Sequence, residues 1–122
     1  MAKKKHILYV QTSGVDSQKL LGSAFVLATT AKAMDIDATI YFLGLGITVV
    51  KKGMAETVRE GDSLTLKDLM DRAIKAGVQL LVCEQSARLL RMDRGDLIPE
   101  VKVVGAATLN DLVLEVDATM WF

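Results

Sequence analysis

The sequence has very little of the residues that build disulfides and metal centres. Its 122 residues include one cysteine, Cys83, and one histidine, His6. A single cysteine cannot form an internal disulfide, and a closed zinc site needs about four nitrogen or sulfur ligands. The carboxylates are not clustered at ligand spacing, so they do not complete such a set. We therefore expect no internal disulfide and no bound metal, and the sequence indicates no cofactor.

The sequence also lacks an excess of charge and a long apolar run. Lysine plus arginine and aspartate plus glutamate number 15 each, which gives a formal net charge of zero. Nucleic-acid and membrane partners favour a basic protein surface. Residues 6–10 are apolar but are broken by Gln11, so this run is too short for a signal peptide or for a membrane span of roughly 20 residues. We expect a cytoplasmic protein that binds neither nucleic acid nor membrane.

Hydrophobic residues make up 51% of the chain, enough for a core, and the length fits one domain over residues 1–122. Short apolar runs between turn residues predict buried strands. These strands are expected at residues 6–10, 38–43, 78–82, 101–104 and 118–122. Because helical patterns separate them, the sequence predicts a parallel sheet with helices on both faces.

The helical patterns begin at recognisable capping residues. Asp16 or Ser17 is expected to cap a helix that runs to about Met34. Thr65 and Asp68 form a capping box, and Gly77 is expected to end the helix behind them. Three further helices are predicted at residues 47–54, from 84 to about 92, and from a cap at Thr108 or Asn110 to about 116.

Ligands of open parallel sheets bind beyond the carboxyl ends of the strands. The segments expected at that edge are residues 11–16, 44–46, 83–86 and 105–108. The free amides of Thr12, Ser13 and Gly14 are candidates for holding an anion, with Gly44 and Gly46 beside them. An ordinary strand-to-helix turn explains the same residues. Neither a dinucleotide fingerprint nor a phosphate-binding Walker sequence is present.

Cys83 is expected where a strand passes directly into a helix, at the carboxyl edge of the sheet and at least partly reachable from a pocket. The positive end of a helix dipole favours thiolate, and Ser86, three residues later, is placed to donate a hydrogen bond to it. Arg88 adds positive charge nearby and is a candidate ligand-binding residue, whereas the charge of Glu84 opposes it. His6 begins the first strand, so it is expected at the opposite edge and not as a catalytic partner. The alternative is that Cys83 is a small buried core residue.

The segment around Cys83 resembles the cysteine segment of the DsrE/DsrF-like proteins. It reads VCEQSARLLRM over residues 82–92, and the family pattern is roughly V/A-C-x-x-S/A-A. Residues 12–14 with the following small-residue helix, residues 38–46 and residues 109–117 are similar to other parts of the family. Residues 90–92 depart from the arginine and glycine of many relay members, which leaves the partner and pathway open.

The resemblance implies a three-layer α/β/α domain with a five-stranded parallel sheet. It also implies a sulfur-relay role, in which Cys83 carries sulfane sulfur as a persulfide between a donor and an acceptor protein. The pathway would be tRNA thiolation, sulfur oxidation or another. Some relatives are labelled predicted peroxiredoxins, but a lone Cys83 has no internal resolving thiol. Family members commonly form trimers or hexamers, so a homo-oligomer is expected.

Two other functions remain open from the sequence. The protein is alternatively a small-ligand or nucleotide-binding module, or a structural or regulatory homo-oligomer in which Cys83 only packs. The last two residues of the sequence, Trp121 and Phe122, are large aromatic residues that must be shielded from solvent. A neighbouring subunit could shield them. The helix predicted at residues 47–54 is expected to reach across the same interface. Alternatively, the two aromatic residues cap the domain's own core.

Overall fold

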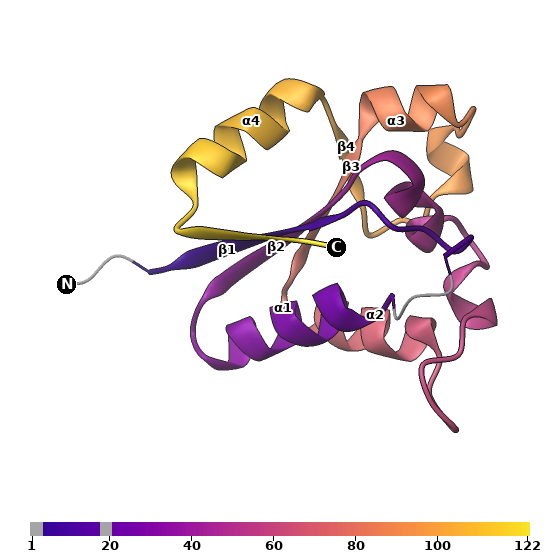
Figure 1. Ribbon diagram of the computed structural model, residues 1–122, viewed down its shortest axis with the longest axis horizontal. Helices are drawn as coiled ribbons and strands as arrows, with labels where there is room; N and C mark the ends of the chain where they lie inside the picture. Colours follow the sequence, from indigo (N-terminus) through magenta and orange to yellow (C-terminus); the bar gives the residue numbers. More distant parts are fainter. Residues whose placement is uncertain (1–3, 18–20) are drawn as a thin grey trace.

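The computed structural model describes residues 4–17 and 21–122 and contains a sheet with helices on both sides (Figure 1). The strands are β1 (His6–Gln11), β2 (Asp37–Phe42), β3 (Gln79–Cys83), β4 (Lys102–Val104) and β5 (Ala118–Trp121). The α-helices are α1 (Ser23–Ala33), α2 (Leu66–Ala76), α3 (Glu84–Leu89) and α4 (Ala106–Glu115). The 3-10 helices are η1 (Gly44–Val50), η2 (Ala55–Thr57) and η3 (Arg94–Asp96).

The five strands pair in the order β4-β3-β2-β1-β5, and every pair is parallel. Strands β2, β3 and β4 are added one after another on the same side of β1. Strand β5 is then added on the other side of β1. Parallel crossover connections are right-handed, so the connection from β4 back to β5 places its helix, α4, on the face opposite to α1 and α2. The predicted five-stranded parallel α/β fold is therefore confirmed, and all five predicted strands are present within one residue of their expected ends.

The two faces of the sheet are covered unequally. On one face, α1 and α2 enclose the larger core, which contains Phe25, Phe42 and Met70. On the other face, α4 covers a smaller core, which we call the α4-side core. Its buried members are Leu8, Val10, Tyr41, Leu81 and Cys83. No residue of α4 is itself buried, so this helix covers the sheet only partially.

Helix α2 has the ends that the sequence predicts. The Thr65 side chain accepts a hydrogen bond from the Asp68 amide, and the Asp68 carboxylate accepts one from the Thr65 amide. Gly77 ends the helix in the left-handed conformation, with φ of 94°. That conformation is strained for residues with a Cβ atom, which is the reason for glycine here.

The start of α1 differs from the prediction. The helix begins at Ser23 after Gly22, not after Asp16 or Ser17. The Ser17 amide instead donates to the Gly14 carbonyl, and the Val15 amide donates to the Thr48 hydroxyl. Residues 14–17 therefore form a turn that is tied to η1. Part of the predicted helix, residues 18–20, lies outside the described residues.

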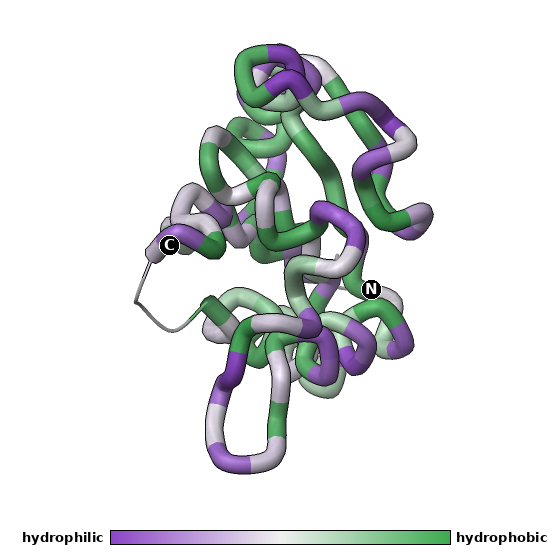
Figure 2. The backbone as a smooth tube through the Cα atoms, turned by 90° about the vertical axis from the view of Figure 1, so that its right-hand side faces the viewer, coloured by the Kyte–Doolittle hydropathy of each residue, from purple (hydrophilic) through white to green (hydrophobic). Residues whose placement is uncertain are grey.

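The segment after β2 also differs from the prediction. It forms η1 at Gly44–Val50 and not a helix over residues 47–54. Ile47, Val49 and Val50 are buried in the core of this chain. These apolar side chains are thus covered within the chain, and a contact of this segment across a subunit interface stays a prediction. The polar loop that follows η2 projects from the body and is visible in Figure 2.

The last helix and the last strand give two further results. Helix α4 begins after Gly105, and Thr108 lies in its first turn with its amide bonded to the Gly105 carbonyl. The predicted caps at Thr108 and Asn110 are therefore wrong. Phe122 packs against the larger core, whereas Trp121 on β5 is 54% exposed. Only one of the two terminal aromatic residues thus caps the domain's own core.

Two absences concern the described residues alone. Within residues 4–17 and 21–122, the helices are all too short or too polar to cross a bilayer. The same residues bring together no group of three or more histidine, cysteine, aspartate or glutamate side chains suited to a metal ion.

We predict that Thr65→Ala lowers the free energy of unfolding by about 1 kcal/mol, because the first turn of α2 loses its cap. Thr30→Ala is the matched control, since Thr30 is exposed within α1 and alanine favours a helix. Urea unfolding followed by circular dichroism measures both variants. Equal stabilities for the two variants would contradict the assigned cap.

Candidate functional site

Cys83 lies at the junction that the sequence predicts. It is the last residue of β3 and also the residue that precedes the first turn of α3. Its parallel partner is Val104, the last residue of β4, so Cys83 lies at the carboxyl edge of the sheet. His6 begins β1 at the opposite edge, where its ring Nε2 lies 2.8 Å from the Thr39 hydroxyl. The histidine is therefore not a partner of the thiol.

The Cys83 side chain points into the α4-side core and is 3% exposed. The expectation of a thiol that is reachable from a pocket is therefore not met in this closed structure. The cover is thin, however, because Gln85 is exposed and its Oε1 lies 3.7 Å from the Cys83 sulfur, within reach of the thiol proton. A single side chain at the surface thus contacts the buried sulfur.

Ser86 is placed beside the sulfur by η1. The Gly44 amide donates a hydrogen bond of 2.8 Å to the Ser86 hydroxyl oxygen, and Ser86 is buried. A serine hydroxyl has one proton to donate and accepts with its oxygen. Because its oxygen accepts from Gly44, its proton remains free to point at the sulfur.

Burial raises the pKa of the Cys83 thiol, but hydrogen bonds to the sulfur outweigh it and hold the pKa below the ordinary cysteine value. The donors, in order of effect, are the hydroxyl and amide of Ser86, the Tyr41 hydroxyl and the Gln85 amide. The direction agrees with the sequence expectation. Hydrogen bonding to the charged form is the cause, since each donor stabilises thiolate.

Sequence reasoning missed Tyr41 and Gln85. Tyr41 lies on β2 with its hydroxyl 3.2 Å from the Gly105 carbonyl oxygen, to which it donates. It is fully buried, and burial together with the adjacent Cys83 raises its pKa, so the hydroxyl keeps its proton. Strand alternation carries the signal for Tyr41. It pairs with Leu81, and Leu81 shares a face with Cys83.

The structure does not bring Arg88 to the sulfur. Its guanidinium is largely exposed and forms an ion pair with Glu84 one turn earlier in α3. An exposed pair of this kind contributes little to stability. The arginine predicted to bind a ligand is therefore directed toward solvent.

The first loop binds the end of the described chain. The amides of Thr12 and Ser13 and the Thr12 hydroxyl all donate to the main-chain oxygen of Phe122, at 2.6 to 3.2 Å. These two amides are therefore not free for an anion, contrary to the expectation from the sequence. Gly14 lies against η1, where an added Cβ atom would be 2.1 Å from the Leu45 carbonyl oxygen.

The two glycines of η1 have different structural tasks. Gly46 packs directly on β1, since an added Cβ atom would lie 1.9 Å from the Gln11 carbonyl oxygen. Gly44 adopts φ of 58°, a left-handed conformation that glycine accepts without strain. Together they bring the Gly44 amide to Ser86. Their predicted role in ligand binding remains a prediction.

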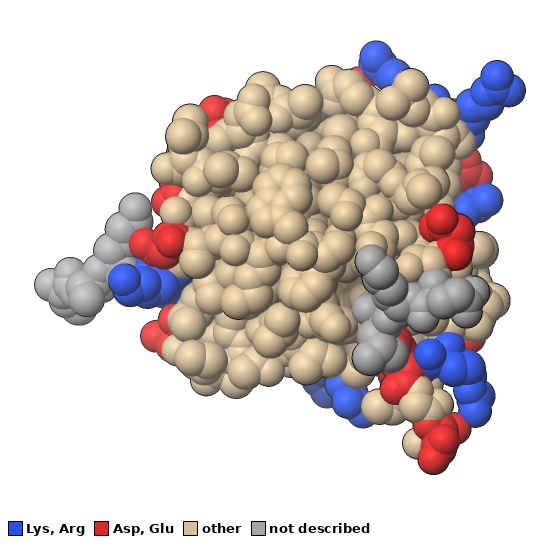
Figure 3. Space-filling model, in the orientation of Figure 1, with Lys and Arg blue, Asp and Glu red and all other residues tan. Residues whose placement is uncertain are grey.

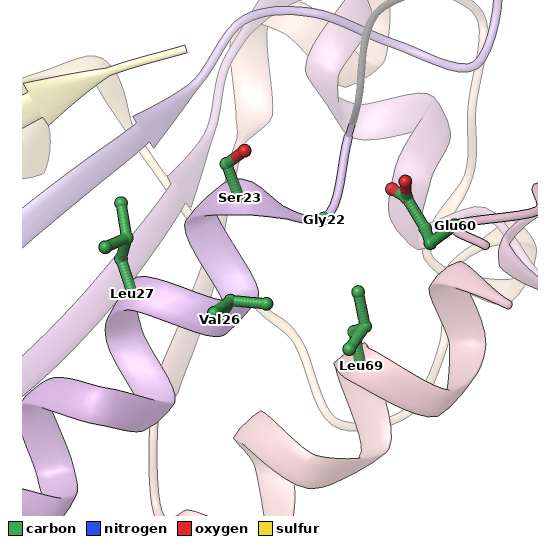
Figure 4. Close-up of a pocket in the computed structure, with 6 residues that line it drawn as sticks. All are labelled: Gly22, Ser23, Val26, Leu27, Glu60 and Leu69. Atoms are coloured by element: carbon green, nitrogen blue, oxygen red, sulfur yellow. The ribbon is translucent and has the colours of Figure 1, made fainter. Parts of the chain in front are cut away.

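A separate pocket of about 370 Å³ lies on the α1 and α2 side of the sheet (Figure 4). Its lining residues are Gly22, Ser23, Val26, Leu27, Glu60 and Leu69. Glu60 approaches Gly22 at the start of α1, and its buried Oε1 has no hydrogen-bond partner among the residues that the structure describes. None of the candidate residues from the sequence lines this pocket, so it is distinct from the Cys83 site.

The family model described as the DsrE/DsrF-like family matches residues 5–122. The chain therefore belongs to the DsrE/DsrF-like family, as the sequence resemblance indicates. Proteins of this family act in sulfur-relay complexes.

The individual relatives are described without a function. Uncharacterized protein MJ0760 of Methanocaldococcus jannaschii is 25% identical over 108 residues, covering 88% of this chain and 39% of that protein. This chain thus spans well under half the length of that relative. The ychN protein from E. coli has a TM-score of 0.77 at 16% identity, covering 98% of this chain and 100% of that chain.

A second solved structure supports the same fold. Protein of unknown function MTH1491 from Methanobacterium thermoautotrophicum has a TM-score of 0.71 at 17% identity, again covering 98% of this chain and 100% of that chain. At these identities, the likeness shows the fold alone.

We predict that Ser86→Ala raises the pKa of the Cys83 thiol, because the sulfur loses its strongest donor. The thiolate fraction at neutral pH then falls, and alkylation slows. The rate of reaction with iodoacetamide against pH measures this pKa, and Cys83 is the sole cysteine in the chain. Arg88→Ala is the control, with no expected shift. An inflection that stays in place in Ser86→Ala would refute the role of Ser86.

Proposed function

We propose that this chain is a sulfur carrier that holds sulfane sulfur as a persulfide on Cys83. The main supporting observation is the set of donors around one sulfur, with Ser86 and Tyr41 contributing hydroxyls. Membership of the DsrE/DsrF-like family adds support. A carrier needs one nucleophilic thiolate and a shielded site, and neither a base nor a metal is required when the thiol pKa is lowered.

The proposed loading step is a thiol exchange with a persulfide or polysulfide donor. The Cys83 thiolate attacks the outer sulfur of the donor, and a new sulfur–sulfur bond forms on Cys83. The bond within the donor breaks, and its electron pair leaves with the inner sulfur as a thiolate. The outer sulfur keeps its own proton, so atoms and electrons balance without a further oxidant. Delivery to an acceptor thiolate repeats the same exchange.

The residues around the sulfur have separate tasks in this proposal. Ser86 stabilises the attacking thiolate through its hydroxyl, which Gly44 orients. The apolar neighbours Leu8, Val10 and Leu81 exclude water from the loaded sulfur and so shield the persulfide from unrelated thiols. The donor and acceptor proteins are left open. A cytoplasmic location belongs to the same proposal, since a reducing compartment keeps a lone thiol free.

The contacts give the small-ligand alternative less support. The amides of Thr12 and Ser13 already donate to the main-chain oxygen of Phe122, and the Arg88 side chain faces solvent. The remaining alternative is that Cys83 only packs within the α4-side core.

Sulfur loading tests the proposal directly. We predict that incubation with inorganic polysulfide, followed by intact-mass measurement, adds sulfur to the wild-type chain and none to Cys83→Ser. Ser86→Ala should load several-fold more slowly at neutral pH, because less thiolate is present. Treatment with a reducing agent should return the original mass. A wild-type mass that stays unchanged after prolonged incubation would leave Cys83 as a packing residue.

We further propose that the protein is a homo-oligomer, assembled through one apolar face. Among the described residues, the large exposed apolar side chains lie on α1 or its end, α4 and β5, except for Leu45 and Leu89. The residues on these three elements are Val26, Leu27, Met34, Val113, Leu114, Met120 and Trp121. Figure 3 shows this side of the molecule, with charged side chains at its margin and few across its middle.

The position of β5 adds a second reason. It is an edge strand, and all of its residues are exposed. An open, apolar edge strand is prone to pair with another chain unless it is covered. A second copy of this chain would cover β5 and the outer surface of α4 together. Trimers and hexamers, expected from the family resemblance, belong to this proposal.

Two leucines of nearly equal exposure test the apolar face. Leu114 on α4 is 85% exposed and Leu89 on α3 is 83% exposed, but only Leu114 lies on the proposed interface. We predict that Leu114→Glu lowers the mass measured by light scattering at micromolar concentration, whereas Leu89→Glu does not. A monomeric wild-type protein would refute the oligomer, and equal effects of the two variants would refute the assigned face.

A further inference from the structure

The buried Cys83 sulfur raises the question of how a donor reaches it. The start of α4 lies over this side of the sheet and is bound there by side chains that also contact the sulfur. Ala106, the first residue of α4, is exposed, as is Gln85. The cover of the sulfur is therefore a surface structure and not deep core.

Gln85 joins the sulfur to the start of α4. Its Oε1 accepts a hydrogen bond of 3.1 Å from the Ala106 amide and lies 3.7 Å from the Cys83 sulfur, which donates its proton to it. One amide oxygen thus binds both the thiol and the first amide of the helix. Loss of the thiol proton removes the bond between Cys83 and Gln85. The thiolate sulfur and the Gln85 Oε1, which are both acceptors, then face each other.

Tyr41 makes the second connection. Its hydroxyl donates to the Gly105 carbonyl oxygen at 3.2 Å, and the same hydroxyl lowers the pKa of the Cys83 thiol because it is placed to hydrogen-bond to the thiolate. A phenol has a single proton, so it cannot donate fully to both acceptors. A thiolate is the stronger acceptor of the two because charge strengthens a hydrogen bond. Sulfur that carries a charge therefore draws the proton of Tyr41 away from Gly105.

We propose that Gln85 and Tyr41 are positioning residues that latch the start of α4 over Cys83, and that release of this latch admits the sulfur donor. The proposal rests on the carrier function proposed above and describes how that site is regulated. In the thiol form both bonds to residues 105 and 106 are made. In the thiolate form both are weakened but not lost, so the thiolate is more accessible than the thiol, and removal of either side chain opens the site further.

The surroundings of the sulfur leave few other charges to control the latch. The neighbours from β1, β3, β4 and α4 are apolar, and they are Leu8, Val10, Leu81, Val104, Leu109 and Leu112. Tyr41 on β2 is the titratable group that contacts the sulfur, and it keeps its proton. Glu84 on α3 is engaged by Arg88. Ionisation of Cys83 itself is therefore the local change to which the latch responds.

The first turn of α4 is suited to move, because the proposed subunit interface involves Val113 and Leu114 in the second half of the helix. No residue of α4 is buried, and Leu109 and Leu112 are only partly buried against the sheet. Gly105 links it to β4. Elements with few buried contacts open at low free-energy cost. Displacement of the first turn therefore exposes Cys83 without unfolding the sheet.

Gln85→Ala is the principal test. Gln85 is exposed, so the substitution removes both hydrogen bonds without disturbing the core. The readout is the limiting rate of Cys83 alkylation by iodoacetamide at a pH where the thiol is fully ionised, which separates access from acidity. We expect this rate to rise about two- to fivefold, because the hydrogen bond to Ala106 is weakened in the thiolate form but is still made. An unchanged limiting rate overturns the latch.

Gln79→Ala is the matched control for this test. Gln79 is also an exposed glutamine and lies at the opposite end of β3, where it accepts a hydrogen bond from Thr39. We expect its limiting rate to equal that of the wild type. An equal rise in both variants would indicate general loosening of β3 and would also overturn the latch.

Tyr41→Phe separates the latch from a simple structural role. The ring is kept, and the hydroxyl is lost. We expect the pKa of Cys83 to rise, because a donor to the thiolate is removed, while the limiting rate at high pH also rises. A merely structural hydroxyl would not move these two quantities together. A limiting rate that stays unchanged or falls overturns the role of Tyr41.

These measurements use no sulfur donor, so they remain distinguishable from the test of the carrier function. Sulfur loading with an unchanged alkylation rate in Gln85→Ala would keep the carrier and refute the latch. A faster alkylation rate without sulfur loading in the wild type would show a latched thiol but refute the carrier, and with it the proposed purpose of the latch.

Discussion

The close approach of η1 to the carboxyl end of β1 is the constraint on which the site depends. Gly46 lies so near the Gln11 carbonyl that no side chain fits between them, and this contact fixes the path of the chain after β2. The Gly44 amide is thereby held against the Ser86 hydroxyl. Because that amide occupies the serine oxygen, the serine proton is directed to Cys83. This backbone contact thus helps to orient one of the hydroxyls that lower the pKa of the Cys83 thiol.

The unequal cover of the two sheet faces explains most of the remaining features. The return of the chain from β4 to β5 places α4 alone on the face that contains Cys83. A lone helix cannot bury its residues on all sides, so its outer surface and the adjacent edge strand stay apolar and exposed. In the proposed carrier, this thin cover both shields the sulfur and admits the donor. The proposed shielding, access and assembly thus all depend on the placement of one helix.

Local sequence signals predicted the elements whose causes are local. The strands, the capping box at Thr65 and Asp68, and the junction at Cys83 follow from side-chain periodicity and capping chemistry within a few residues. The start of α1 and the form of η1 were predicted wrongly because distant groups decide them. The Thr48 hydroxyl holds the turn before α1, and the larger core takes up the apolar residues of η1. Capping rules consider only residues within a few positions of the helix end, so they cannot predict contacts with distant residues.

The sequence by itself determined the parallel α/β fold, the family resemblance and the placement of Cys83 and Ser86 beside each other at a strand end. Those features depend on spacing along the chain, which the sequence states directly. Tertiary structure alone decided that Tyr41 and Gln85 contact the sulfur, that Arg88 turns outward, and that the amides of the first loop bind Phe122. The Tyr41 contact and the binding of Phe122 depend on which strands are neighbours and how their registers align, whereas Gln85 and Arg88 are oriented by their contacts with Ala106 and Glu84. Long-range backbone pairing fixes that alignment, and spacing along the chain does not.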